Sequence, residues 1–122
     1  MDYLSKFNDV FCEMITDLVK VFPTDSQLRM YKFGLDAYIA SDETIISCLF
    51  YDQVTTRYAE KIKNQDESFF LEKDFQEFSD YNSVLDVVSK LKSCWLELND
   101  ENKVVIWRYF KVLLNLSERY GA

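Results

Sequence analysis

The chain of 122 residues contains no histidine, two glycines and one proline. The absence of histidine excludes a Ser-His-Asp triad, a Cys-His dyad, a zinc site with imidazole ligands and a histidine pH switch. The two glycines, Gly34 and Gly121, lie far apart, so the chain has no phosphate-binding glycine loop, nucleophile elbow or dinucleotide fingerprint. The shortage of glycine and proline also argues against a β-sandwich with many tight turns.

Positive charge is also scarce, because 21 acidic residues face 14 basic ones and give a net charge of −7. Clustered cations drive the binding of nucleic-acid phosphates and of anionic lipid surfaces, so we expect neither direct nucleic-acid binding nor membrane attachment. No apolar run reaches the roughly 18 residues that a membrane span needs. The first residues mix charged and apolar side chains and lack a signal-peptide core, which predicts a cytoplasmic or nuclear protein.

The three cysteines, Cys12, Cys48 and Cys94, are widely spaced and form no C-x-x-C pair. Each lies in an apolar helical pattern, which predicts buried free thiols in a reducing compartment. Neither a metal site nor a cofactor is expected from these residues.

Apolar residues recur three and four positions apart along most of the chain, which predicts helices. The expected helices cover about 4–21, 25–40, 42–63 and 83–98, followed by a fifth that begins after Asn99 and runs toward Gly121. Pro23 ends the first helix, and the capping oxygens of Thr24, Asp25 and Ser26 begin the second. The sequence therefore predicts one all-α domain over residues 1–122, a compact bundle of about five helices.

The third and fourth expected helices are joined by residues 66–80, which hold six acidic residues, one lysine and four phenylalanines. We expect a short acidic, Phe-rich loop or helical turn. A calcium loop beginning at Asn64 fails, because its central glycine and closing glutamate would fall on Phe69 and Phe75. The phenylalanines either cover the core as a lid or contact a partner, and the pattern leaves both readings open.

After an acidic first turn, Asp100 and Glu101, the fifth expected helix is basic, with Lys103, Arg108, Lys111 and Arg119 against Glu118. Either the acidic segment packs near this helix, or one of the two docks a partner of opposite charge. Trp95 and Trp107 either anchor the last two helices to each other or form an interface hot spot. The candidate partner-binding residues are Glu67, Phe69, Phe70, Glu72, Asp74, Phe75, Glu77, Phe78, Arg108 and Lys111.

Several stretches together suggest a resemblance: Val21-Phe22-Pro23, Glu67-Ser68-Phe69-Phe70-Leu71-Glu72, Leu91-Lys92-Ser93-Cys94-Trp95, Asn102-Lys103 and Ile106-Trp107-Arg108-Tyr109-Phe110. Their order resembles small all-helical proteins of unassigned function encoded by large DNA viruses of algae and protists. The resemblance implies a protein of infected-cell cytoplasm, nucleus or virion. It carries no activity and no functional residue over to this chain.

The residues contain no recognisable catalytic set, so we expect a non-enzymatic protein–protein interaction or adaptor module. The partner is a protein of unknown identity, and self-association into a homo-oligomer is left open. One alternative is a structural component of a virus particle. Another is an acidic decoy that mimics nucleic acid and occupies a basic nucleic-acid-binding protein.

Overall fold

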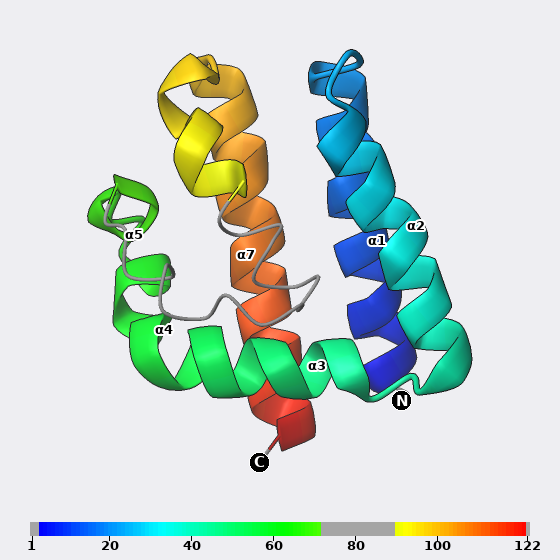
Figure 1. The fold of residues 1–122 in the computed structure, drawn as a ribbon. Helices are drawn as coiled ribbons and strands as arrows, with labels where there is room; N and C mark the ends of the chain where they lie inside the picture. The colour runs from blue at the N-terminus through cyan, green and yellow to red at the C-terminus, as the bar shows by residue number, and fades with distance from the viewer. Residues whose placement is uncertain (1–2, 72–89, 122) are drawn as a thin grey trace.

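The fold is all-helical throughout the part of the chain that the computed structural model describes, residues 3–71 and 90–121. This confirms the predicted all-α class. Helix α1 (Tyr3–Val21) lies antiparallel to both α2 (Ser26–Ser41) and the long α7 (Asp100–Gly121), and it packs against both (Figure 1). None of the helices in the described ranges has the length and apolar character to cross a membrane.

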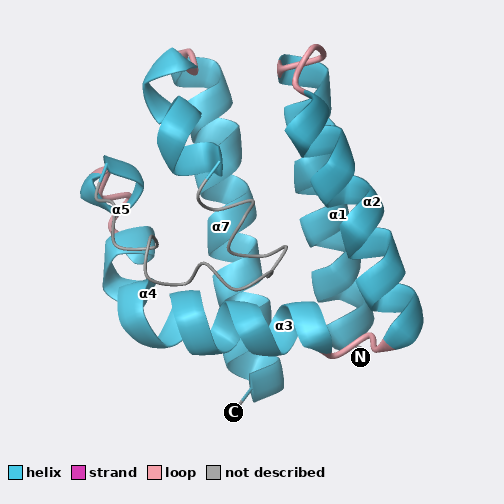
Figure 2. Ribbon diagram, in the orientation of Figure 1, coloured by secondary structure: helices cyan, strands magenta, loops and turns pink. Residues whose placement is uncertain are grey.

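A short turn joins α1 to α2 (Figure 2), and capping side chains mark the starts of α2 and α7. Helix α1 ends before Pro23, since proline restrains the residue that precedes it. Asp25 is the N-cap of α2, and its side chain accepts hydrogen bonds from the backbone N–H groups of Gln27 and Leu28 at 3.0 and 3.3 Å. Asn99 accepts the backbone N–H of Asn102 at 2.8 Å and begins α7 in the same way.

The expected third helix is a continuous helical run, but a π-helical turn interrupts it. The run consists of α3 (Ile45–Phe50), the π turn η1 (Tyr51–Thr55) and α4 (Thr56–Lys63), and it changes direction between α3 and α4 (Figure 1). Apolar residues spaced four apart drift by about 40° per step in a regular α-helix. The wider π turn has more residues per turn and turns the apolar stripe back toward the core. As a result, all five apolar residues are buried: Ile46, Phe50, Val54, Tyr58 and Ile62.

Aromatic rings from α1, α3 and α7 form the middle of the core. Phe7 and Phe11 stack on each other, and both contact Phe50 edge-on at 5.4 and 6.4 Å between ring centroids. Phe50 then meets Phe110 of α7 at 6.0 Å. These four side chains have no exposed surface, so α1, α3 and α7 share one hydrophobic core.

A buried hydroxyl pair ties the π turn to α7. Thr55 Oγ1 lies 2.6 Å from Ser117 Oγ, and Ser117 Oγ in turn donates to the carbonyl of Leu114 at 2.9 Å. Because Ser117 has only one hydroxyl hydrogen, Thr55 is the donor of the pair. The contact satisfies both buried hydroxyls and holds the bend against the C-terminal half of α7.

Two expected features differ in the structure. The expected helix 83–98 is described only from residue 90: residues 90–94 are helical, and the chain then tightens into the 3-10 turn η3 (Trp95–Glu97). Val21, expected on the inner stripe of the first helix, is 37% exposed because it lies in the last turn, next to Phe22-Pro23.

Candidate protein-interaction surfaces

The acidic segment begins with a tight turn and the short helix α5 (Ser68–Leu71). The Asp66 side chain accepts the backbone N–H of Ser68 at 3.0 Å, and this hydrogen bond holds the pKa of Asp66 below its ordinary value. The turn directs Phe69 and Phe70 into the core, where neither has any exposed surface. Both are candidate partner-binding residues by sequence, and the lid alternative holds for these two, because the bundle itself supplies their apolar contacts.

The buried end of this lid is an aromatic cluster that joins α5, η3 and α7. Phe70 stacks on Trp95 with ring centroids 4.1 Å apart and meets Trp107 edge-on at 5.0 Å. Trp95 and Trp107 are themselves in edge contact at 5.6 Å, and both are buried. The two tryptophans thus anchor the last two helical segments to each other, and the alternative of an exposed hot spot at these rings is wrong.

The polar side of the segment lies against the basic helix α7. Lys103 Nζ is 3.7 Å from the Glu67 carboxylate and 5.3 Å from the Trp95 ring centroid. Lys111 Nζ donates to Gln65 Oε1 at 3.1 Å. Gln65 and the start of the acidic segment, Glu67, therefore pack near α7, which was one of the two alternatives.

The other candidates divide into exposed residues and residues outside the described ranges. Glu67, Arg108 and Lys111 are exposed on the surface. Arg108 forms no ion pair or hydrogen bond with the side chains that the structure describes. Glu72, Asp74, Phe75, Glu77 and Phe78 lie outside the described residues.

The outer face of α2 is an apolar surface outside the candidate residues predicted from the sequence. It consists of Met30, Phe33, Ala37 and Ala40, all exposed, and Phe33 and Met30 are 79% and 68% exposed. The opposite face of the helix buries Leu28 and Leu35 against the bundle. The signal was present in the sequence: these four residues follow steps of three, four and three, which is a second helical stripe.

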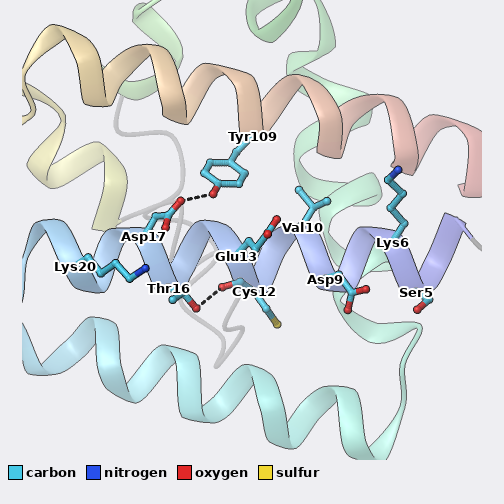
Figure 3. A pocket seen from close by; sticks show the side chains of 10 residues that line it. All are labelled: Ser5, Lys6, Asp9, Val10, Cys12, Glu13, Thr16, Asp17, Lys20 and Tyr109. Atoms are coloured by element: carbon cyan, nitrogen blue, oxygen red, sulfur yellow. Dashed lines mark hydrogen bonds between the residues drawn. The ribbon is translucent and has the colours of Figure 1, made fainter.

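A groove of about 890 Å³ runs along the exposed side of α1, lined by nine residues of that helix and by Tyr109 of α7 (Figure 3). Tyr109 donates its phenolic hydrogen to Asp17, and burial together with this contact raises the pKa of Tyr109 above its ordinary value. Asp9 and Glu13 extend the carboxylate row toward the start of α1. The phenol stays protonated at neutral pH, so it acts here as a structural donor between α1 and α7.

The thiols differ in exposure, and only one is fully buried. Cys94 is buried and Cys12 is half-buried, and burial is the main cause that raises the pKa of both thiols, for Cys94 to about 11. Neither thiol is ionised near neutral pH, so neither is an activated nucleophile. Cys48 is exposed, and its expected burial is wrong because the apolar stripe of α3 passes through Ile46 and Phe50 instead.

Among the described residues, no group of three or more cysteine, aspartate or glutamate side chains is arranged to hold a metal ion. Comparison with models of known protein families, with curated proteins and with solved structures gives no significant match to this chain. The resemblance to helical proteins of large DNA viruses stays a prediction.

Proposed function

We propose that this chain is a non-enzymatic protein-interaction module and that the outer face of α2, formed by Met30, Phe33, Ala37 and Ala40, is its docking surface. The observation that carries the proposal is Phe33, a large aromatic side chain that is 79% exposed in the middle of a helix. Burying a phenylalanine stabilises a protein or a complex by about 1.5–3 kcal/mol. In the folded chain most of that stabilisation is not realised, and a partner that covers this face gains part of it.

The surroundings of Phe33 favour docking of a rigid body. Helix α2 lies at the edge of the bundle, where it packs against α1 and α3 (Figure 1). Its N-terminus is capped by Asp25, and the backbone N–H of Asp42 closes its C-terminus onto the carbonyl of Tyr38. In a helix capped at both ends the backbone is already ordered, so binding does not have to order it, which favours affinity.

The alternation of large and small side chains on the outer face of α2 suits a helical partner. Ala37 and Ala40 are small, so the surface is low beside the projecting rings and chains of Phe33 and Met30. Such a pattern of large and small residues lets a side chain of a partner helix insert between neighbours. The matching partner is an apolar helix face with charged residues at its border.

The described start of the acidic segment, residues 66–71, is engaged within the chain itself. Phe69 and Phe70 are buried, and Glu67 and Lys111 are engaged with Lys103 and Gln65 of the same chain. Residues 65–71 therefore stabilise the bundle, and the proposal places docking on α2.

Photo-crosslinking tests the docking surface directly. The full chain carries benzoylphenylalanine in place of Phe33, and a matched control carries it in place of Leu96, which is 77% exposed on η3. With the variant at about 500 μM in an extract of the source cells, position 33 is expected to give a discrete protein adduct on irradiation, and position 96 is expected to give none. Equal labelling at both positions, or none at position 33, would overturn the proposal.

A further inference from the structure

We infer that the partner on the outer face of α2 is a second copy of this chain, docked so that the two α2 helices pack antiparallel about a two-fold axis next to Phe33. This inference rests on the proposed docking surface and names its occupant. Charged residues that border the apolar stripe favour this pairing.

Arg29 and Asp36 lie on the same border of that stripe. They are seven residues apart, about two helical turns, so both project from one flank of α2. Both are exposed. Arg29 contacts the carbonyl of Pro23, and Asp36 lies 3.7 Å from Lys32 in a solvent-exposed pair, so each retains capacity for a further partner.

A two-fold axis perpendicular to the helices reverses the direction of the second helix. It also places the flank that carries Arg29 and Asp36 on the same side of the contact in both copies. When antiparallel pairing is centred on Phe33, the numbers of two residues that face each other add up to about 66, twice 33. Arg29 lies opposite Asp36 of the second copy, offset along the axis by about 1.5 Å, the rise of one residue. The symmetry gives this ion pair twice, one at each end of the contact.

The apolar residues match under the same axis. Phe33 lies beside its own symmetry mate, and Met30 lies over the small side chain of Ala37 from the second copy. Large residues thus meet small ones on both sides of the central ring pair. Parallel pairing about an axis along the helices would instead move the two charged flanks to opposite sides, so Arg29 and Asp36 would not meet.

One 16-residue helix is about 24 Å long, so this contact is at the small end of specific interfaces. The expected dimer is therefore weak and concentration-dependent. Sedimentation equilibrium of the full chain over a wide concentration range, from about 5 to 500 μM, measures it. The average mass should rise toward that of two chains as the concentration increases.

Charge exchange makes the test specific for the antiparallel geometry. Arg29→Asp alone and Asp36→Arg alone each place like charges opposite one another at both ends and should weaken the dimer about tenfold or more. The double variant Arg29→Asp, Asp36→Arg restores two pairs of opposite charge and should recover most of the affinity. Phe33→Glu should give a monomer, and Leu96→Glu, the control of matched exposure, should leave the dimer unchanged.

The outcomes separate this inference from the proposed function. A chain that stays monomeric at the highest concentration, or single charge variants that dimerise as well as the wild type, would overturn the homodimer. Failure of the double variant to recover affinity would overturn the antiparallel register. If benzoylphenylalanine at position 33 then crosslinks to a protein of another mass, the docking surface stands with a different partner, and if it crosslinks to nothing, both proposals fall.

Discussion

The ring of Phe70 lies nearly flat on the indole of Trp95, with centroids 4.1 Å apart and an angle of 12° between the planes. This contact joins the acidic turn after α4 to the turn that precedes α7. Each ring is fully buried, and Trp107 and Phe110 close the cluster from α7. The described start of the acidic segment is thus fixed to the bundle by Phe69 and Phe70.

Phe70→Ala is expected to lower the free energy of unfolding by about 3–5 kcal/mol, the usual cost of removing a fully buried aromatic ring. The matched control is Phe33→Ala, which removes the same side chain from an exposed position and should change stability by no more than about 0.5 kcal/mol. Urea unfolding at low protein concentration, followed by tryptophan fluorescence, measures both values. Equal effects of the two substitutions would contradict the lid assignment.

Glu67→Gln is expected to change the free energy of unfolding by less than about 1 kcal/mol, since its carboxylate is half exposed where it faces Lys103. Any loss should shrink in high salt, because screening weakens exposed ion pairs. Urea unfolding in low and high salt measures this, with the exposed Glu60→Gln as the control. A loss above about 2 kcal/mol that persists in high salt would show that the acidic turn depends on this pair for its fold.

Helix positions and caps could be predicted from the sequence because they depend on local chemistry. Asp25 caps α2, Pro23 limits α1, and the stripe through Trp107, Phe110 and Leu114 is the buried face of α7. The strict four-residue spacing from Ile46 through Phe50 to Ile62 also indicated the π turn η1. A regular α-helix does not keep such a stripe on one side, so the spacing was a usable signal.

The candidate site was less predictable, because tertiary packing decides which apolar residues are covered. Phe69 and Phe33 are equally hydrophobic, but only Phe69 meets a facing helix in the fold. The sequence of α2 predicts an inner apolar stripe through Leu28 and Leu35, and it also contains a second stripe through Phe33 that the fold leaves uncovered. The exposure of Cys48 depended on the same choice of face on α3.

The three thiols are expected to react with Ellman's reagent in the order Cys48, Cys12, Cys94. Cys48 is exposed, Cys12 is half-buried, and Cys94 is buried with its pKa raised to about 11 by that burial. Cys48→Ser should remove the fast phase in the native protein, and Cys94 should react only after unfolding. The absorbance time course at pH 8 measures the three phases. Fast modification of Cys94 in the folded chain would contradict the packing of residues 90–94.

Asp25 links the cap of α2 to the segment before α7. Lys90 Nζ lies 2.6 Å from Asp25 Oδ2, and this hydrogen bond is the main cause that lowers the pKa of Asp25, followed by the backbone N–H groups of the cap. A carboxyl whose pKa is lower in the folded chain than its ordinary value of about 3.9 adds stability above that pH. The contribution is lost as the pH falls through the lowered, folded-state pKa.

Asp25→Ala is therefore expected to cost about 1 kcal/mol at pH 7, mainly through the lost cap, and the cost should shrink below about pH 4. Asp25→Asn keeps a capping oxygen and removes only the charge that faces Lys90. Its smaller deficit at pH 7 isolates the ion pair, and it should vanish once the wild-type carboxyl is protonated. Urea unfolding of the three proteins at pH 7, 5, 4 and 3 measures these differences. A gap between wild type and Asp25→Asn that stays constant from pH 7 to pH 3 would mean that the Asp25 charge does not contribute to stability.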